Sequence, residues 1–390
     1  MKNTIGDNLT LTLFGESHGS YIGGVLDGIT PGIKIDEEFI KSQLTKRRPQ
    51  KNIETTRVED DDFVLASGVF NGYSTGAPLT ILIPNQNIKS KDYEALKNVA
   101  RPSHADFTAN DKYHGFQDYR GGGHFSGRLT APIVALGSII IKALEKKNIY
   151  IGTHILKCGK AIDTNFNGSL QELKSLHNKN FPVLTDIEET IKNEILKCAN
   201  EGDSLGGILQ TEIIGLPVGL GEPWFSSVEG KLANAIFSIG GVKGIEFGLG
   251  FGFSNEKGST CNDSFYVEEG IIKTKTNHNG GINGGITNGM PVVFNVSVKP
   301  TPSISLPQET VDFVKLENVS LSIKGRHDPA IIRRIAVVID SLTAIMIADM
   351  LITRLNVKAQ SILRQRKEES DSRKECNTRG DPLHPHDDLR

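Results

Sequence analysis

Apolar and polar residues alternate at positions 9–13, where the sequence reads Leu-Thr-Leu-Thr-Leu, and a short apolar run follows at positions 22–26. Alternation over several residues is typical of a half-buried strand, so this pattern predicts two strands. The residues between them, Gly-Glu-Ser-His-Gly at positions 15–19, therefore form a loop. His18 lies on that loop.

A helix is predicted next. Asp36 can cap it, and it continues through Lys46 until the sequence Arg47-Arg48-Pro49 ends it, because a residue before proline is driven out of the helical region. Two arginines are thereby placed at a helix end.

Longer apolar segments predict the core. Helices are expected at about 127–147 and 329–355, strands at about 205–214 and 292–298, and a capping box at 185–188 begins one further helix. The most apolar segment, 335–352, contains Asp340 and Asp349, which indicates a buried helix rather than a membrane span. The mixture of elements predicts an α/β or α+β fold.

Composition narrows the class of protein. The chain has 390 residues, of which 37% are hydrophobic and 41 are glycine. That is enough to bury a sizeable core, and it indicates many turns and close backbone approaches. The chain has 44 basic and 46 acidic residues. Its net charge is therefore near zero, and no electrostatic field of the whole surface attracts nucleic acid or an anionic membrane. Any anionic ligand must be bound by a local arginine cluster.

Cysteine usage and the N-terminus indicate a cytoplasmic protein. The four cysteines, at 158, 198, 261 and 376, form no closely spaced pair that would suggest zinc or a redox dithiol. The first residues lack a basic segment followed by an apolar one, so no export signal is expected.

Three glycine-rich stretches lie at 120–123, 240–252 and 277–285. None has the strand, G-x-G-x-x-G and helix order of a dinucleotide-binding fold. From Arg364 onward large apolar residues almost disappear, so we expect one catalytic domain at 1–363 and a disordered charged tail at 364–390.

A weak internal repeat is visible. Two Gly-Gly-aliphatic segments, at 23–26 and 206–209, and two Gly-Arg helix starts, at 127–128 and 325–326, recur in the same order. Two similar halves would explain this. Chance recurrence in a glycine-rich chain is the alternative, and the sequence alone favours it.

Candidate chemistry lies on loops. His18 and His104 are histidines in predicted loops, although either one taken alone fits a structural role. Several arginines adjoin proline or glycine at element boundaries, where a guanidinium can bind phosphate or carboxylate. Asp328 precedes a proline at the start of the last long helix, where helix capping is an equally good explanation.

Five motifs together resemble one family. They are the loop 15–19 followed by Asp27-Gly28, then Arg47-Arg48-Pro49, Arg-Pro-Ser-His-Ala-Asp at 101–106, Arg-Gly-Gly-Gly at 120–123 and Gly-Arg-His-Asp-Pro at 325–329. In this order they resemble chorismate synthase over residues 1 to about 355. The resemblance implies an α+β fold of the β-α-β sandwich type, assembled as a homotetramer. It also implies conversion of 5-enolpyruvylshikimate 3-phosphate to chorismate and phosphate by anti-1,4-elimination, with reduced FMN that is not consumed overall.

The resemblance also implies site roles. His18 would protonate the reduced flavin, His104 the departing phosphate, and Asp328 would assist deprotonation at flavin N5. The substrate-binding residues it implies are Arg47, Arg101, Ser126, Arg128 and Arg326. The flavin contacts it implies are His124, Phe125, Ser126, Gly284, Lys299, Pro300, Thr301, Pro302, Ser303 and Arg326.

The chain departs from the family pattern in three places. The sequence Gly-His-Phe-Ser-Gly-Arg-Leu-Thr at 123–130 replaces the common Gly-Arg-Ser-Ser-Ala-Arg-Glu-Thr, and Asp340 stands where glutamate is common. Ile53 replaces an arginine that often follows the Arg-Arg-Pro element, which weakens the case for NADPH binding.

Two other functions remain open from the sequence. A flavin reductase that oxidises NADPH would need a nicotinamide site, for which no motif is visible. A non-catalytic flavin- or phosphate-binding protein would explain the glycines and arginines but would leave His18, His104 and Asp328 without a role. NADPH could act as the reductant directly, or a separate flavin reductase could be a partner.

Overall fold

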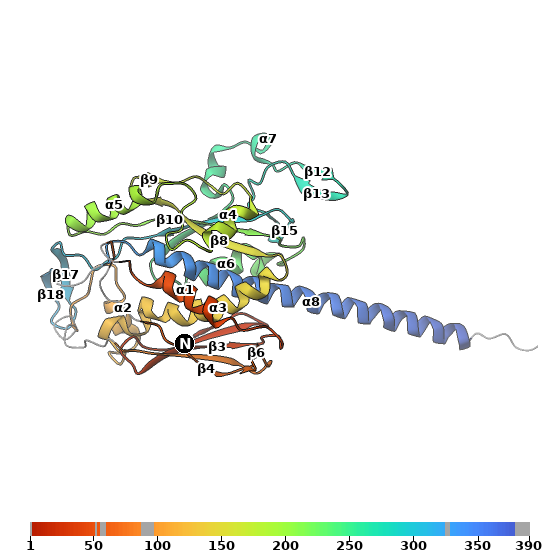
Figure 1. Ribbon diagram of the computed structural model, residues 1–390, viewed down its shortest axis with the longest axis horizontal. Coiled ribbons are helices and arrows are strands. Elements are labelled where there is room, and N and C mark those ends of the chain that lie inside the picture. Colours follow the sequence, from red (N-terminus) through yellow and green to blue (C-terminus); the bar gives the residue numbers. More distant parts are fainter. Residues whose placement is uncertain (1, 51–52, 55–59, 87–96, 324–327, 379–390) are drawn as a thin grey trace, which may run out of the picture.

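The computed structural model describes residues 2–50, 53–54, 60–86, 97–323 and 328–378, with side chains as far as Ser361. Figure 1 shows two layers of strands with helices between them and one helix that extends from the body.

The N-terminal part of the chain forms an antiparallel sheet with the strand order β1-β2-β3-β7-β4. Leu79, Ile81 and Ile83 alternate with half-exposed residues along β7, so one face of this sheet faces the core. The two strands predicted from positions 9–26, with the His18 loop between them, are confirmed. The strands are β1 (Thr4–Ile5), β2 (Thr10–Gly15), β3 (Tyr21–Asp27), β4 (Val64–Ser67) and β7 (Leu79–Pro84).

A second antiparallel sheet has the order β9-β8-β10-β16-β11. The strands predicted near 205–214 and 292–298 are confirmed as β10 and β16, two of its three inner strands. The strands are β8 (Tyr150–Cys158), β9 (Ala161–Ile162), β10 (Gly207–Ile214), β11 (Val242–Phe247) and β16 (Val292–Val298).

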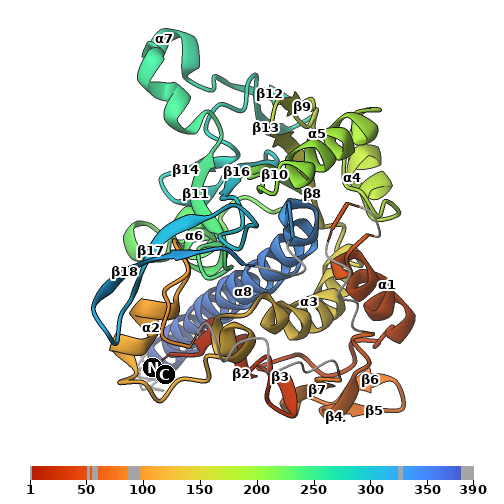
Figure 2. The ribbon, with the colours of Figure 1, turned by 90° about the vertical axis from the view of Figure 1, so that its left-hand side faces the viewer.

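Two long helices, α3 (Thr130–Glu145) and α8 (Ile332–Thr378), fill the space between the sheets (Figure 2). They approach closely where Gly137 meets Ser341: a Cβ at Gly137 would lie 2.4 Å from the Ser341 Cβ. The segments Arg120–Glu145 and Ile332–Ser361 are apolar enough to cross a membrane, but 78% of each apolar window is buried inside the fold. Both therefore have the burial of core helices.

Four strands of each sheet share one topology, and only the outer strands β1 and β9 differ in chain order. The chain order β2-β3-α1-β4-β7-α3 corresponds to β8-β10-α6-β11-β16-α8, where α1 is Glu37–Arg47 and α6 is Val228–Ile236. Gly23 and Gly24 lie on β3 and Gly207 lies on β10, the middle strand of each sheet. The topology thus favours the internal repeat over chance. The sequence pointed the other way because two short glycine motifs carry little information.

Helix boundaries follow the sequence in part. Asp36 caps α1 as predicted, accepting a hydrogen bond from the Phe39 backbone at 3.0 Å. The capping box predicted at 185–188 is wrong: α5 begins without a side-chain cap, and the Thr185 hydroxyl donates to Asp163 at 2.6 Å instead.

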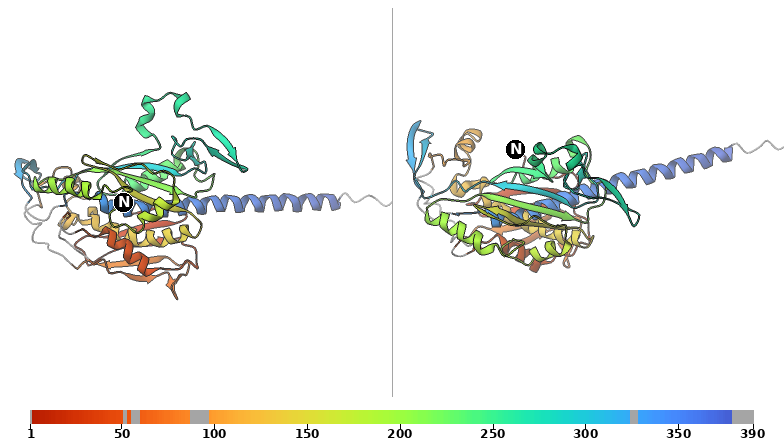
Figure 3. Two further views of the ribbon diagram at one scale, coloured as in Figure 1. Left: turned by 45° about the horizontal axis from the view of Figure 1, so that its top comes forward. Right: turned by 90° about the horizontal axis from the view of Figure 1, so that it is seen from above.

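Helix α8 continues through Thr378, past the point where a disordered tail was expected, and leaves the body as a single rod (Figure 3). The division into a domain and a tail stays a prediction.

The smaller elements surround these layers. In Figure 1, α2 and the β17-β18 hairpin lie near the start of α8, while β15 lies on the side from which α8 leaves the body. The remaining helices are α2 (Asp106–Lys112), α4 (Leu170–Leu176), α5 (Glu188–Asn200) and α7 (Gly258–Cys261). The remaining hairpins are β5 (Val69–Phe70) with β6 (Tyr73–Ser74), β12 (Phe265–Glu268) with β13 (Ile271–Thr274), β14 (Ile282–Asn283) with β15 (Ile286–Thr287), and β17 (Gln308–Asp312) with β18 (Glu317–Leu321).

Candidate active site

The glycine-rich loop at 120–125 lies directly against His18. Gly121, Gly122 and Gly123 all have positive φ angles, 59°, 83° and 53°, which residues with a Cβ rarely adopt. A Cβ at Gly121 would lie 2.1 Å from Cε1 of His18. The loop can therefore pass the buried His18 ring only because its residues are glycines.

Hydrogen bonds fix this loop to the His18 loop. The Ser17 backbone N–H donates to the Gly123 carbonyl at 3.1 Å, and the Ser17 hydroxyl lies 3.0 Å from the Gly121 carbonyl and 3.1 Å from Nδ1 of His18. The His124 ring reaches back to the Gly15 carbonyl, with Nδ1 at 2.9 Å. His18 and the glycine-rich loop thus form one unit although about 100 residues separate them.

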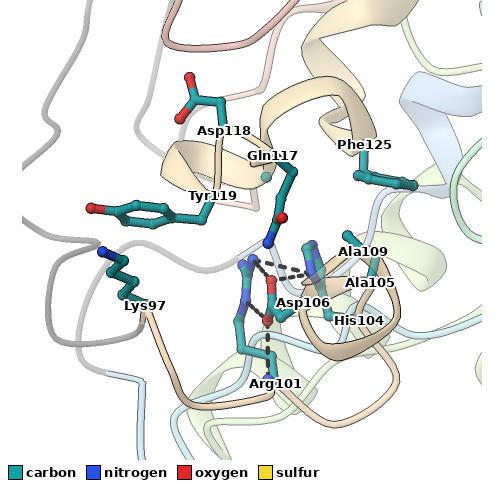
Figure 4. Close-up of a pocket in the computed structure, with 11 residues that line it drawn as sticks. Lys97, Arg101, His104, Ala105, Asp106, Ala109, Gln117, Asp118, Tyr119 and Phe125 are labelled. Atoms are coloured by element: carbon teal, nitrogen blue, oxygen red, sulfur yellow. Dashed lines mark hydrogen bonds and ion pairs between the residues drawn. The ribbon is translucent and has the colours of Figure 1, made fainter. Parts of the chain in front are cut away.

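His104, just before helix α2, lies against the next glycine of the glycine-rich loop. A Cβ at Gly122 would lie 3.8 Å from both Cε1 and Nε2 of His104. The Nδ1 atom of the ring faces Asp106, whose Oδ1 lies 2.8 Å from it. Arg101 forms a bidentate pair with the same carboxylate, with both N–O distances 2.8 Å (Figure 4).

A pocket of about 460 Å³, a volume that includes its open mouth, lies above these groups. The Gln117 side chain points toward Arg101 and His104 (Figure 4), and its Oε1 is buried without a hydrogen-bond partner among the described residues. An unpaired buried acceptor is costly, so a polar ligand would be favoured there. The pocket is lined by Lys97, Arg101, His104, Ala105, Asp106, Ala109, Gln117, Asp118, Tyr119, Gly122 and Phe125.

Two carboxylates at the pocket are held ionised by cations. Burial of Asp106 favours its neutral form, but hydrogen bonds from Arg101 and His104 outweigh burial and hold its pKa well below the usual range. The Arg120 guanidinium, 2.8 Å from Asp118, lowers the pKa of that carboxyl against a smaller effect of burial, and the charge of His18 contributes.

Arg47 and Arg128 share a buried carboxylate, that of Asp61. Arg47 NH1 donates to its Oδ2 at 2.9 Å, and Arg128 pairs with its Oδ1. Arg128 Nε also donates to Asn85 at 3.1 Å. Asn85 in turn donates to the Glu16 and Gly19 carbonyls at 3.0 and 2.8 Å, which ties Arg128 to the His18 loop.

Arg333, on the first turn of α8, supports the end of helix α1 that carries Arg47. Its guanidinium donates to the Lys46 carbonyl at 2.9 Å and to the Arg48 carbonyl at 2.5 Å. It is also paired with the buried Glu54 at 2.5 Å. The start of α8 is thereby joined to the arginine segment.

The segment 299–303 and Asp328 come from the second half of the chain and reach the same region. The Lys299 ammonium donates to the Ser103 carbonyl at 2.5 Å, one residue before His104. The Thr301 hydroxyl donates to the Asp328 carbonyl at 2.6 Å, and the Asp328 carboxylate pairs with Arg334. Pro300, Pro302 and Ser303 belong to this segment.

One expected residue, Gly284, lies away from the others within one chain. Gly284 lies in the turn between β14 and β15, a hairpin that packs near Val218, to which Arg354 donates at 2.9 Å. Arg354 follows the start of α8 by about 20 residues, which is roughly 30 Å of helix. Within one chain Gly284 is therefore remote from Lys299. Arg326 lies outside the described residues.

Sequence reasoning missed several residues of the site. Asp61, Asn85 and Gln117 carry no motif, and Asp106 was part of one without an assigned role. Asp61 could have been suspected from the acidic run at 59–62, but its arginine partners are 14 and 67 positions away. Nothing local in the sequence marks that pairing.

The arrangement suits chemistry on a polyanionic ligand. Several guanidinium groups can bind phosphate and carboxylate, and the two histidines lie against neighbouring glycines of one loop, where they can supply protons. Phe125 adds an aromatic ring that is 46% exposed at the pocket.

Comparisons with known proteins agree with this geometry. Residues 9–352 match a family model described as chorismate synthase. A chorismate synthase of Pyrococcus abyssi is 43% identical over 346 residues, covering 89% of this chain and 96% of the relative. One of Dehalococcoides mccartyi is 44% identical over 353 residues, covering 90% and 96%. A crystal structure of chorismate synthase superposes with a TM-score of 0.71 at 28% identity, covering 90% of this chain and 93% of the other.

Proposed function

Because this chain belongs to the chorismate synthase family, we propose that the pocket at its glycine-rich loop is where substrate phosphate is eliminated. The activity is that of a carbon–oxygen lyase of aromatic amino acid biosynthesis, the seventh step of the shikimate pathway. 5-Enolpyruvylshikimate 3-phosphate loses phosphate by anti-1,4-elimination and becomes chorismate.

One observation carries the proposal: His18 and His104 pack against Gly121 and Gly122, which are consecutive residues. Consecutive Cα atoms are about 3.8 Å apart, so one short stretch of loop holds both imidazoles. A small substrate lying over this loop would be within reach of both. We assign His104, which lies beside Arg101, to protonation of the departing phosphate, and His18 to proton exchange with the cofactor.

The arginines bind the anionic groups of the substrate, a phosphate and two carboxylates. Arg101 lies in the pocket. Arg47 and Arg128 share the single carboxylate of Asp61, so these three residues together retain a net positive charge. Ser126 caps the turn that carries Arg128, with its hydroxyl 3.3 Å from the Arg128 backbone nitrogen. Arg326 completes the set by resemblance to the family.

The residues present fit a flavin. The glycine-rich loop offers a surface without side chains, the Phe125 ring is half exposed, and the Lys299 ammonium offers a positive charge close to the His104 loop. We propose that FMN is held by residues 124–126 and 299–303 together with Arg326. The flavin contact expected at Gly284 stays a prediction, because within one chain Gly284 lies far from Lys299. When bound, reduced FMN would supply transient electron donation to the substrate. Asp328, held by Arg334 at the start of α8, assists deprotonation at flavin N5.

We further propose that a separate reductase delivers the reduced flavin. Ile53, which replaces an arginine common in the family, is buried in the hydrophobic core and offers no positive charge to a nicotinamide phosphate. NADPH as the sole reductant should then give no chorismate, whereas steady turnover with NADPH alone would show that the enzyme reduces its own flavin.

A homotetramer in the cytoplasm is the expected setting. Large apolar side chains of Trp224, Phe225 and Phe251 are 86%, 97% and 84% exposed, as is common at protein interfaces. Cys158, Cys198 and Cys261 are buried free thiols, which suits a reducing compartment. The mass in solution, measured by light scattering, tests the assembly.

The experiment for the activity mixes the protein with photoreduced FMN and substrate under anaerobic conditions. We expect phosphate and chorismate in equal amounts. Flavin binding without phosphate release would instead support a non-catalytic flavin-binding protein.

A further inference from the structure

Asp106 is the first residue of helix α2, and its carboxylate binds two functional side chains. Oδ2 accepts from Arg101 Nε at 2.8 Å and from the Arg101 backbone N–H at 3.0 Å. Oδ1 lies 2.8 Å from Arg101 NH2 and 2.8 Å from Nδ1 of His104. The side chain is only 17% exposed, so these contacts are made largely out of water.

The contacts select one orientation of the His104 ring. An ionised carboxylate can only accept hydrogen bonds, so Nδ1 of His104 carries the hydrogen that faces Asp106. Arg101 NH2 lies 3.1 Å from the same Nδ1 but has Asp106 Oδ1 as a closer acceptor. The Cε1–Nε2 edge of the ring then faces Gly122, on the side of the pocket.

We propose that Asp106 is a positioning residue for phosphate elimination, fixing His104 with Nε2 toward the substrate and Arg101 in a rigid fork beside it. This inference rests on the proposed function and deepens it, because it says how His104 is oriented.

Charged groups on other elements do not duplicate this role. Lys97, Asp118 and Tyr119 line the same pocket, and Lys299 approaches from the segment after β16. The Asp118 carboxylate is paired with Arg120, and the Lys299 ammonium is bound to the Ser103 carbonyl. Among the described residues, Asp106 provides the carboxylate that the ion pairs place at His104.

Asp106→Asn tests the proposal with almost no change of shape. Without the negative charge the protonated imidazole is less favoured, so the fall of kcat on the alkaline side should move about one pH unit toward acid. The substrate KM should rise roughly tenfold, because Arg101 loses a charged partner. Asp106→Glu should restore part of the pH profile.

Asp263→Asn is the matched control. This carboxylate also accepts backbone hydrogen bonds, at 2.7 Å from His278 and 2.8 Å from Asn279, and its Oδ1 lies 3.8 Å from a histidine nitrogen, but it follows α7 outside the pocket. Its pH profile should match that of the wild type. A melting curve for each variant measures any loss of stability separately.

The double variant His104→Ala/Asp106→Asn separates the possible failures. If Asp106 acts through His104, adding Asp106→Asn to His104→Ala should change kcat by less than about twofold. An unchanged pH profile in Asp106→Asn, or fully additive losses of kcat, would overturn the positioning role while leaving the proposed function intact. Wild-type turnover in His104→Ala would instead overturn the proposed role of His104 itself.

Discussion

Single residues in the site are selected for backbone shape as much as for side-chain chemistry. Gly121 has no functional group, yet a Cβ there would overlap the His18 ring. Asp61 and Asp106 do no chemistry of their own in the proposed mechanism, yet each holds two side chains that do. The positions of the reactive side chains therefore depend on neighbouring residues that take no part in the reaction.

Gly121→Ala should therefore damage catalysis more than folding. The new methyl group would displace His18, and a misplacement of about 1 Å can cost about 100-fold in rate, so we expect kcat to fall by about that factor. Gly72→Ala is the control. Gly72 also has a positive φ, of 77°, but a Cβ added there would have no neighbouring atom within 4 Å. Equal turnover in the two variants would show that the contact with His18 does not matter.

Glu212, on β10, predicts a pH dependence of stability. Burial, with a smaller effect of Glu172, raises its pKa from 4.5 to about 7, and its Oε2 has no hydrogen-bond partner among the described residues. Between these pH values the folded state holds a proton that the unfolded state has lost, so stability falls as pH rises through this window and stays lower above it. Glu212→Gln removes this cost.

The expected gain for Glu212→Gln above pH 7 is on the order of 2 kcal/mol in the free energy of unfolding, with little gain near pH 4.5. Urea unfolding at several pH values measures it, and Glu317→Gln, at an exposed strand position, is the control. A gain of the same size at every pH would mean that removal of the charge is not the cause.

At the scale of elements, the core depends on how closely α3 and α8 pack. A Cβ at Gly137 would lie 2.4 Å from the Ser341 Cβ and 2.8 Å from its backbone oxygen, so the two helices approach at a position that only glycine allows. The start of α8 also holds the end of α1 through Arg333. A shift of α8 would therefore also displace the segment that carries Arg47.

Gly137→Ala should destabilise the fold by about 1–3 kcal/mol, the usual cost of overpacking a core. Thermal unfolding measures this, with Gly240→Ala as the control because nothing lies within 4 Å of a Cβ there. Unchanged stability in Gly137→Ala would show that the helices separate without cost.

Truncation after Leu363 should leave turnover and melting temperature nearly unchanged. The α8 side chains become exposed before that point, with Leu355 61% and Val357 57% exposed, so this described part of the helix buries little apolar surface. Turnover, thermal unfolding and the mass in solution together test this. A loss of several degrees, or of the assembly, would show that the distal part of α8 packs against another surface.

At the scale of the whole molecule, the site lies where the two similar halves meet. His18, His104 and Arg128 come from the first half, and Lys299, Thr301 and Asp328 come from the second. Each half supplies one sheet and one central helix. The residues that line the pocket come from the first half, and the second half reaches them where Lys299 binds the Ser103 carbonyl.

Much of this could be predicted from the sequence, because strands, helix caps and family motifs are local. The loop carrying His18, the Asp36 cap and the strands β10 and β16 follow directly from residue patterns. The contacts of His18 with Gly121 and of Arg128 with Asp61 could not, because they join segments 103 and 67 residues apart. Thr185 shows the same limit, since Asp163, a distant partner, takes the hydroxyl that the local pattern assigned to a cap.

The central claim is that the two histidines held by the glycine-rich loop carry out the elimination. The most direct test measures phosphate and chorismate release by the wild type, His18→Ala and His104→Ala under anaerobic conditions, with photoreduced FMN and substrate saturating. We predict equal amounts of both products from the wild type, and a rate lower by about two to four decades in each variant, whose melting temperatures stay close to that of the wild type. Wild-type turnover in either variant, or no phosphate from the wild type, would contradict the account.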